Sequence, residues 1–398
     1  MTLEGGADGS AGGAGGSGSG SSRSGDGSSP SGANPLDSAA ARGAVDHSGM
    51  LELIAGIPDQ IADAWVRTRA FELPASHRGL RAVAMLGMGG SAIGGDLVAG
   101  IWSDRLTASL TIVRGYDLPA WVDASTLVVA SSNSGNTEET ISALGAAVAR
   151  SCPIVAVTTG GALTEAARRA PFPLLAFPGG GMPRAAVGYS VTLLAGLLER
   201  AGLLALTDTE VEGAIAAARA AISAYGPDAP TTANPAKELA WLLLDRLPVV
   251  ESSGFLAPVA RRWKTQFNEN SKSTAIWEEL PEATHNTVVG YPRPEILADH
   301  TYVVFLTSEL EHPRNRLRAA LSGAALYDAH IGYRNVSITG EGRFGQAISA
   351  IVLGDYVTTY LAVLYGIDPT PIEVLSGIKE VLAAADLEVG GTSPKAKP

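Results

Sequence analysis

Short apolar runs alternate with helix-forming stretches from residue 81 onward, and this alternation limits the possible fold more than any other feature of the sequence. The first five runs have the length and composition of buried strands and lie at 82–86, 109–113, 127–130, 154–157 and 173–177. Helix candidates separate them near 92–102, 138–150 and 164–170. Strands that alternate with helices predict right-handed βαβ units and a parallel sheet covered on both faces.

A second alternation follows a Pro- and Ala-rich joint at 224–235. Strand candidates lie at 248–252, 300–307 and 335–339, and helix candidates lie at 236–246, 255–271 and 313–330. The apolar stretch at 344–365 has the length of a membrane span, but Asp355 and two threonines interrupt it, so we expect a core helix. We therefore predict an α/β protein with two tandem domains, each a parallel sheet flanked by helices.

The two ends of the chain differ in composition from the alternating part. Residues 1–34 contain 12 Gly and 9 Ser without apolar periodicity, which is typical of a solvated tail. An apolar stripe at helical spacing from Met50 to Trp65 predicts a helix behind that tail. The expected division is a disordered tail at 1–46, an N-terminal helix at 47–68, domains at 69–223 and 224–384, and a flexible C-terminus at 385–398.

The charge balance and the cysteine content limit the classes of partner that the protein can bind and the cell compartment in which we expect it. With 40 acids and 29 bases, the formal net charge is −11, whereas a nucleic-acid binder normally carries a basic stripe. Cys152 is the sole cysteine, which excludes an internal disulfide, and the sequence shows no signal-peptide pattern at Met1. We expect a cytoplasmic protein that binds neither nucleic acid nor membrane.

A glycine-rich turn follows the first predicted strand, with the sequence Leu-Gly-Met-Gly-Gly-Ser-Ala-Ile-Gly-Gly-Asp at 86–96. Glycines at the start of a helix let backbone N–H groups approach an anion. Gly87, Gly89 and Ala92 also match the loose form of a dinucleotide fingerprint. The next strand, however, ends in Val113-Arg114 instead of the acid that would bind a ribose hydroxyl. Tight packing of strand and helix remains a second explanation of these glycines.

Hydroxyl and amide side chains crowd the end of the third predicted strand, where residues 131–140 read Ser-Ser-Asn-Ser-Gly-Asn-Thr-Glu-Glu-Thr. The free amide donors and the dipole of a helix N-terminus favour a negative charge at this point. Because the segment holds neither Lys nor Arg, it predicts a neutral cradle for one phosphate monoester, unlike a P-loop. The alternative is an ordinary helix cap formed by Asn136 or Thr137.

Three further residues have the chemistry of a proton-transfer site. Arg184 follows three glycines and a proline, where a fixed guanidinium can stabilise an oxyanion, although a surface arginine is an equal alternative. Glu269 lies opposite an apolar helix stripe and suits either a proton-shuttling base or a surface pair with Lys272. His285 suits either a general acid/base or a structural histidine.

Taken in order, these segments resemble the bifunctional phosphoglucose/phosphomannose isomerases, which are proteins with two tandem sugar isomerase (SIS) domains of flavodoxin-like fold. The shared motifs are G-M-G-G-S-A-I-G-G-D, S-x-S-G-N-T-x-E-T, P-R-A-A-x-G, N-E-N-S-K and E-L-P-E-x-x-H-N, within residues 50–384. The resemblance implies interconversion of fructose 6-phosphate with glucose 6-phosphate and mannose 6-phosphate through a cis-enediol. It implies neither a metal nor a redox cofactor, and the sequence has no H-x-H or C-x-x-C cluster that would suit zinc.

The resemblance also implies roles for individual residues. Those implied to hold the sugar 6-phosphate are Gly90, Ser91, Ser132, Ser134, Gly135, Asn136 and Thr137. Arg184 would stabilise the enediolate, Glu269 would move the proton between C1 and C2, and His285 would assist ring opening. Thr370 and Lys379 would line the site. The family is dimeric, so we expect a homodimer with its active site at the subunit interface, into which His285 reaches from the partner.

Two other functions remain open. A SIS protein that senses sugar phosphates without turnover needs the serine-rich cradle but not Arg184, Glu269 and His285 together. An NAD-dependent oxidoreductase would use the glycine-rich turn and would change the absorbance of the nicotinamide. The presence of all three residues favours the isomerase.

Overall fold

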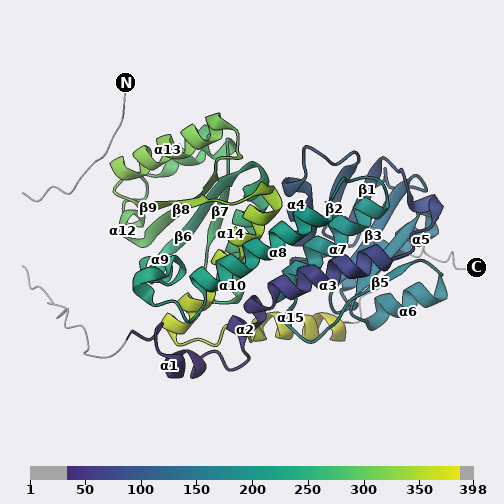
Figure 1. Ribbon diagram of the computed structural model, residues 1–398, viewed down its shortest axis with the longest axis horizontal. Helices are drawn as coiled ribbons and strands as arrows, with labels where there is room; N and C mark the ends of the chain where they lie inside the picture. Colours follow the sequence, from purple (N-terminus) through teal and green to yellow (C-terminus); the bar gives the residue numbers. More distant parts are fainter. Residues whose placement is uncertain (1–33, 386–398) are drawn as a thin grey trace, which may run out of the picture. The chain divides into compact units, whose positions relative to one another are not determined.

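A computed structural model describes residues 34–385, and two parallel β-sheets organise this part of the chain (Figure 1). The first sheet has the strand order β2-β1-β3-β4-β5, which is the flavodoxin-like order, and all its neighbouring strands run parallel. Its strands are β1 (Ala82–Leu86), β2 (Ser109–Val113), β3 (Thr126–Ser132), β4 (Ile154–Thr158) and β5 (Leu174–Ala176). The helices that follow its strands are α4 (Gly89–Ile101), α5 (Glu138–Ala149), α6 (Gly161–Arg169) and α7 (Val187–Arg200).

The second sheet repeats the arrangement of the first four strands. Its order is β7-β6-β8-β9, again with parallel neighbours, so the α/β class with two parallel sheets is confirmed. Its strands are β6 (Leu247–Ser253), β7 (Ile276–Leu280), β8 (Thr301–Ser308) and β9 (Gly332–Ile338). Its helices are α9 (Pro235–Leu243), α10 (Ala257–Glu269), α11 (Thr287–Gly290), α12 (Leu297–His300), α13 (Pro313–Asp328), α14 (Gly342–Tyr365) and α15 (Glu373–Ala384).

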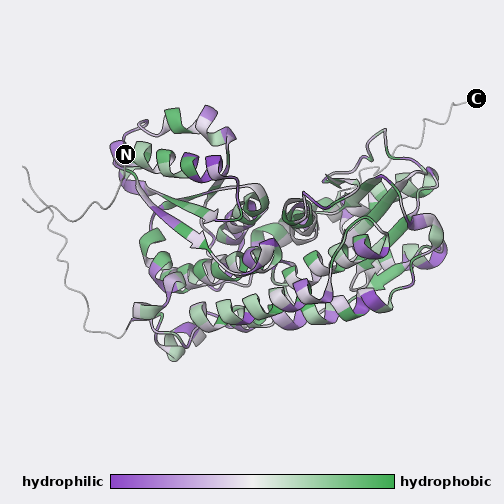
Figure 2. Ribbon diagram, turned by 45° about the horizontal axis from the view of Figure 1, so that its top comes forward, coloured by the Kyte–Doolittle hydropathy of each residue, from purple (hydrophilic) through white to green (hydrophobic). Residues whose placement is uncertain are grey.

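Successive residues of a strand face opposite sides of its sheet, and here they enter different hydrophobic clusters. In β1, Val83 and Met85 join the large central cluster, whereas Ala84 and Leu86 join a smaller cluster with residues of α5 and α6. Because both faces are covered, a central strand such as β3 is buried at every residue. The strands of the first sheet accordingly appear hydrophobic along their length in Figure 2.

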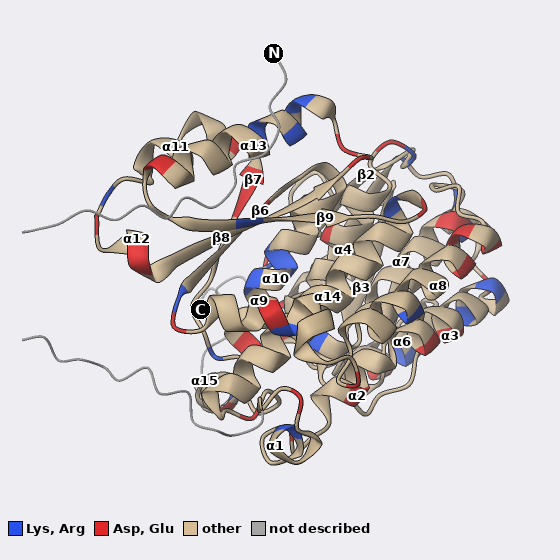
Figure 3. Ribbon diagram, turned by 60° about the vertical axis from the view of Figure 1, so that its left-hand side comes forward, with Lys and Arg blue, Asp and Glu red and all other residues tan. Residues whose placement is uncertain are grey.

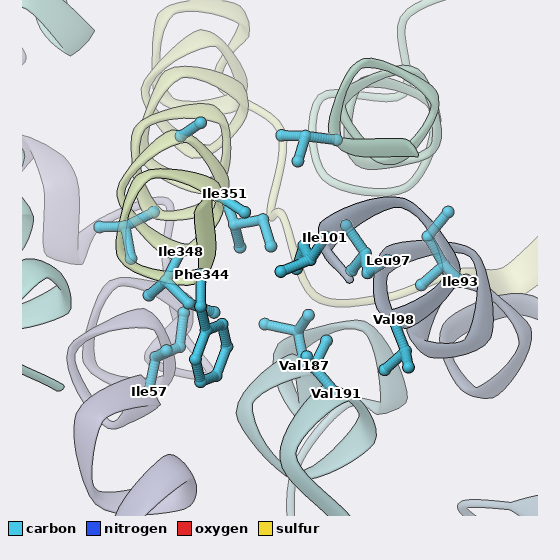
Figure 4. Close-up of a cluster of buried hydrophobic side chains, with 14 of the residues drawn as sticks. Ile57, Ile93, Leu97, Val98, Ile101, Val187, Val191, Phe344, Ile348 and Ile351 are labelled. Atoms are coloured by element: carbon cyan, nitrogen blue, oxygen red, sulfur yellow. The ribbon is translucent and has the colours of Figure 1, made fainter. Parts of the chain in front are cut away.

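The central cluster draws side chains from both sheets and their helices, so the two expected domains share one core. Helices α3 (Ile57–Ala70), α4, α7 and α14 meet in it (Figure 4), and the side chains involved include Ile57, Leu97, Ile101, Val187, Val191, Phe344, Ile348 and Ile351. Helix α8 (Asp208–Tyr225) packs on both α3 and α14. The expected boundary at 223/224 therefore falls within a helix that belongs to the shared core.

Helix α14 is the long apolar segment that we expected in the core. Within residues 34–385 it is the helix that is long and apolar enough to cross a membrane, and 89% of its most apolar window is buried in the protein. Side chains of both halves of the molecule, rather than lipid, thus surround it. The helix ends at Gly366, whose positive φ of 67° suits a left-handed C-cap.

The structure corrects two expectations near the N-terminus. Residues 34–46 do not belong to a disordered tail, because α1 (Ala39–Gly43) forms there and Leu36 is completely buried; residues 1–33 lie outside the described range. The Asp37 carboxylate also contacts the buried Lys237 ammonium at 3.0 Å. The single helix expected at 47–68 is two helices, α2 (Met50–Ala55) and α3, since Pro58 in the first turn of α3 lacks the N–H that a continuous helix requires.

Glu251 of β6 is a buried acid inside the apolar cluster on the outer face of the second sheet. Phe305 of β8 and Glu278 of β7 lie beside it in register, and the acidic residues of β7 are visible in Figure 3. Tyr291 donates a hydrogen bond of 2.6 Å to Glu251 Oε1. Burial raises the pKa of Glu251 to about 7; the Tyr291 hydrogen bond opposes this rise, and the charge of Glu278 adds to it.

We expect the pH dependence of stability to report this raised pKa. In the unfolded chain the Glu251 carboxyl has a pKa of 4.5, so the folded protein holds the proton more tightly. The resulting stabilisation is complete below pH 4.5 and is lost as the pH rises through about 7, a change of about 3 kcal/mol. Glu251→Gln, which does not titrate, is expected to reduce the pH dependence of the unfolding free energy in urea between about pH 5 and pH 8. Equal pH slopes in the two proteins would contradict this prediction.

Candidate active site

The two loops expected to bind phosphate lie next to each other at one edge of the first sheet. Strands β1 and β3 are neighbours, with Leu86 opposite Ala130, so both end at this edge. After β1 the chain continues to β2 on one side, and after β3 it continues to β4 on the other side. The crevice between two strands whose connections run in opposite directions is the usual ligand site of a parallel sheet. Helices α4 and α5 begin at these loops, and no side chain caps either N-terminus.

Hydrogen bonds of its own hydroxyl groups and one glycine determine the conformation of the loop after β3. The Ser132 and Thr137 hydroxyl oxygens lie 2.8 Å apart, and the Gly135 N–H donates to Ser132 Oγ at 3.0 Å. Gly135 has a φ of 70°, and a Cβ added there would lie 1.8 Å from the Gly160 carbonyl oxygen, so only glycine fits. Ser134 is exposed at the loop surface.

The capping alternative does not describe this loop. Thr137 occupies the N-cap position of α5 but forms no capping hydrogen bond. Asn136 Oδ1 instead accepts a hydrogen bond of 2.9 Å from the Ala162 N–H. The first amides of α5 are therefore left for another acceptor, as a bound phosphate would require.

The N-terminus of α4 packs directly against the segment that carries Arg184. A Cβ added at Gly90 would lie 2.9 Å from the Pro183 carbonyl oxygen, so the glycine permits this close approach. The Ser190 hydroxyl donates to the Gly90 carbonyl at 3.0 Å and ties α7 to the same turn. Ser91, in the first turn of α4, is half-buried. The predicted phosphate loop and the predicted oxyanion-stabilising arginine are thus adjacent.

Arg184 is a buried arginine, not a surface one, and is only 4% exposed. Its Nε donates to Asn270 Oδ1 at 2.7 Å, and its Nη1 contacts Glu269 Oε2 at 3.4 Å. Its Nη2 donates to the carbonyl oxygens of Pro369 and Thr370 at 2.7 and 2.9 Å. Burial lowers the pKa of Arg184, and the nearby Glu269 and Asp355 carboxylates oppose this shift. Four of the five guanidinium donors are occupied, and the remaining one lies on Nη1, beside Glu269.

Glu269 is the last residue of α10, and its carboxylate keeps contact with solvent. Its side chain is 28% exposed and meets Arg184 across the boundary between the two halves of the chain. Asn270, which follows it, is fully buried and also donates to Thr358 Oγ1 of α14 at 3.0 Å. The buried amide next to the predicted base thus links Arg184 to α14.

Lys272 does not form the expected surface pair with the Glu269 carboxylate. Its Nζ lies instead 2.8–3.3 Å from four backbone carbonyl oxygens, those of Glu269, Asn270, Asp368 and Pro369, which share its three N–H donors. Burial lowers the pKa of Lys272 to about 8, and the positive charge of Arg184 adds to this shift. Its φ of 55° places it in the left-handed region at the end of α10. Lys272 thus binds the 368–370 segment to α10.

Thr370, which the resemblance implies to line the site, lies beside Arg184. Its carbonyl oxygen accepts one of the Arg184 hydrogen bonds. Its hydroxyl oxygen is buried and has no hydrogen-bond partner within residues 34–385. A buried hydroxyl without a partner is costly, so this atom is available to a polar ligand group.

His285 and Lys379 are not brought to Glu269 within this chain. His285 ends the short helical turn Glu282–His285 after β7, and its imidazole is exposed and forms no hydrogen bond to the described residues. Lys379 lies on α15, and it too is exposed and forms no side-chain hydrogen bond or ion pair with residues 34–385. A cavity of about 510 Å³ separates α15 from Met182 and Thr370.

A buried ion pair between α10 and α14 supports the site. Arg262 of α10 donates to both carboxylate oxygens of Asp355 in α14, at 2.5 and 2.9 Å, and both side chains are 1% exposed. Arg262 Nη2 also donates to the Arg184 carbonyl at 2.9 Å, and Gln266 Nε2 donates to Asp355 at 2.7 Å.

Sequence reasoning missed Arg262, Gln266 and Asn270, although the last stands in the N-E-N-S-K motif. No group of three or more potential metal ligands occurs within residues 34–385.

Two parallel sheets with an uncharged, hydroxyl-rich loop at the strand ends of the first define a sugar isomerase (SIS) domain protein. Residues 232–382 match the model of the bacterial phospho-glucose isomerase C-terminal SIS domain. Tagatose-6-phosphate ketose/aldose isomerase from Escherichia coli shares the fold, with a TM-score of 0.62, 17% identity and coverage of 82% of this chain and 97% of that one.

Two curated relatives define the family more closely. A bifunctional phosphoglucose/phosphomannose isomerase from Caldicellulosiruptor bescii is 37% identical over 84% of this chain and 99% of the relative. A protein of the same name from Aquifex aeolicus is 32% identical over 76% of this chain and 90% of the relative. The chain belongs to the family of bifunctional phosphoglucose/phosphomannose isomerases. It is accordingly an isomerase, and membership of this family does not support a non-catalytic sensor.

Proposed function

We propose that this chain interconverts fructose 6-phosphate with glucose 6-phosphate and mannose 6-phosphate, and that Glu269 is the base that moves the proton. The observation that carries the proposal is the contact of Arg184 Nη1 with Glu269 Oε2 at 3.4 Å, next to the turn that begins α4. A carboxylate and a cation held together beside a phosphate cradle are the groups that aldose–ketose isomerisation requires.

The phosphate would bind through backbone amides and hydroxyl groups at the α4 and α5 N-termini, and the proposed set is Gly90, Ser91, Ser132, Ser134, Gly135, Asn136 and Thr137. After the ring opens, the Glu269 carboxylate takes the C2 proton of the aldose. The electron pair of that C–H bond forms the C1=C2 bond of the enediol, and negative charge moves onto O1. The remaining Nη1 donor of Arg184 is placed to stabilise that charge.

A proton then passes from the O2 hydroxyl to O1, and return of the carbon-bound proton to C1 forms the carbonyl at C2 and yields the ketose. In the reverse direction, C2 of the enediol is planar, so a proton delivered to one face gives glucose 6-phosphate and to the other gives mannose 6-phosphate. A single site can therefore serve both aldoses. Thr370, whose buried hydroxyl has no hydrogen-bond partner within residues 34–385, is a proposed lining residue of this pocket. The proposed place of action is the cytoplasm, where the buried, unpaired thiol of Cys152 stays reduced.

An assay with both aldose phosphates tests this function. The purified protein, with a chelator present, is expected to form fructose 6-phosphate from glucose 6-phosphate and from mannose 6-phosphate. In deuterated water it is expected to incorporate solvent deuterium at C1 or C2. Binding of fructose 6-phosphate without isomerisation or exchange would refute the proposal and would indicate a sensor.

We further propose a homodimer in which His285 of one subunit completes the site of the other and assists ring opening. The support is that the His285 imidazole is exposed and forms no hydrogen bond to Glu269 or to any other described residue of its own chain. In addition, α15 leaves apolar side chains such as Val374 and Val381 more than 70% exposed. Lys379, on the same helix, is proposed to join the site in the assembled dimer.

Subunit mixing tests the dimer and the origin of His285 together. Glu269→Gln and His285→Ala homodimers are each expected to be inactive. After subunit exchange at equal concentrations, half of the dimers are mixed, and each mixed dimer has one site with intact Glu269 and His285. About a quarter of the wild-type activity is therefore expected to return. No recovery, with exchange verified by native mass spectrometry, would place His285 in the site of its own subunit.

A further inference from the structure

The segment that carries His285 is fixed to the second sheet by a buried contact that no step of the reaction uses. The Tyr291 hydroxyl donates to Glu251 Oε1 at 2.6 Å. Glu251 is completely buried in the middle of β6, and its second carboxylate oxygen has no hydrogen-bond partner within the described residues. A buried carboxyl group with so few partners is costly, so its presence calls for a specific role.

Tyr291 and His285 belong to one short stretch of chain. The stretch leaves β7 at Leu280, passes through the turn that ends at His285 and through α11, and reaches Tyr291. Most of its surface is free: His285 and Asn286 are exposed and Val289 is 79% exposed. A segment with so few buried contacts depends on its anchors for a single conformation.

The anchors lie on either side of His285. Before it, Ala283 is buried and Thr284 Oγ1 accepts a hydrogen bond of 2.6 Å from Arg318 of α13. After it, the half-buried Tyr291 packs on the outer cluster of the second sheet and reaches Glu251. The imidazole itself has no hydrogen bond to the described residues that would orient it.

We propose that Tyr291 and Glu251 are positioning residues that hold the His285 imidazole where it can act on the sugar ring. This inference rests on the proposed role of His285 in ring opening. Neither residue touches the substrate: the Tyr291–Glu251 hydrogen bond fixes the end of the segment, and the segment places the imidazole. Loss of the bond is expected to slow ring opening and leave phosphate binding unchanged, because the cradle lies on the first sheet.

Anomerisation of glucose 6-phosphate separates this step from proton transfer at carbon. Exchange between the α and β anomers requires ring opening and closing but not the C2 proton. The rate can be measured by NMR exchange spectroscopy. Tyr291→Phe, which removes only the hydroxyl, is expected to lower the anomerisation rate and kcat for isomerisation together, by about ten- to a hundredfold, with KM nearly unchanged. Glu251→Gln retains a carbonyl acceptor for the Tyr291 hydroxyl and is expected to keep near wild-type rates.

Matched variants make the result decisive. Tyr302→Phe removes a hydroxyl that donates to the Tyr333 carbonyl in the same sheet and is expected to leave both rates unchanged. Thermal melts verify folding, and if Tyr291→Phe does not fold, Glu251→Met removes the acceptor instead. Wild-type rates in a folded variant without this hydrogen bond would overturn the inference. Wild-type anomerisation in His285→Ala would instead refute the proposed role of His285 itself.

Discussion

Glu269→Gln is expected to lower kcat for isomerisation of both aldose phosphates by about two to four orders of magnitude, because it removes the proposed general base. The amide has the size of the carboxylate and can still accept from Arg184 through its oxygen. The phosphate cradle lies on other loops, so fructose 6-phosphate is expected to bind within a few-fold of its wild-type affinity. Coupled enzyme assays measure kcat, and calorimetric titration measures the affinity for fructose 6-phosphate separately.

An exposed acid provides the control for this experiment. Glu309→Gln changes a side chain that is 80% exposed and contacts Arg316, and Glu309 is not among the residues that bind Arg184. Its activity is expected to match the wild type. If Glu269→Gln retains exchange of the C1 and C2 protons with solvent, another residue is the base.

Asp355→Leu is expected to reduce the free energy of unfolding by about 3–5 kcal/mol, since it leaves the buried Arg262 guanidinium without its counter-charge. Urea melts of the variant and the wild type give this difference. Arg262 also donates to the Arg184 carbonyl, so any folded fraction is expected to show a lower kcat. The double variant Arg262→Met/Asp355→Leu removes both charges and is expected to recover a large part of the stability, but not the activity.

A solvent-exposed ion pair provides the control for the effect of burial on the free energy of unfolding. Glu238 and Arg334 lie 2.9 Å apart with side chains 53% and 37% exposed. Glu238→Gln is expected to cost less than about 1 kcal/mol. If Glu238→Gln and Asp355→Leu reduce the free energy of unfolding by similar amounts, burial does not make the Arg262–Asp355 pair more important for stability than the exposed pair.

The apolar strands could be predicted from the sequence because both of their faces are covered. β1 has the predicted bounds, and β4 differs from its prediction by one residue. β2 lies at a sheet edge and is only partly buried, but it too has the predicted bounds because its sequence Ser-Leu-Thr-Ile-Val is largely apolar. β7 was not predicted: it lies at a sheet edge, two of its five residues (Ile-Trp-Glu-Glu-Leu) are acidic, and Ile276 is exposed. Helix α8 was missed as well, since its many alanines give only a weak apolar stripe.

The candidate site could be predicted only as separate pieces. The residues after β1 and β3 signal an anion site because strand ends and helix starts are visible in sequence. The burial of Arg184 depends on carbonyls 185 and 186 residues further along the chain, which no local pattern reveals. Lys272 looked like a partner of the Glu269 side chain for a similar reason, since the backbone carbonyls that it contacts lie 96 and 97 residues further along the chain, at 368 and 369.

The 368–370 segment has a consequence for protein synthesis. Ribosomes make the chain from its N-terminus, so the phosphate loops, Arg184 and Glu269 all emerge before the carbonyls that accept hydrogen bonds from Arg184 and Lys272. Until residues 368–370 emerge, the Arg184 Nη2 group lacks the two carbonyl acceptors that it has in the folded protein, and Lys272 lacks two of its four. A chain that is terminated after residue 285 but before residue 368 therefore carries Arg184, Glu269 and His285 but an unfinished site. Only a chain translated beyond residue 370 can acquire the arrangement on which catalysis is proposed to depend.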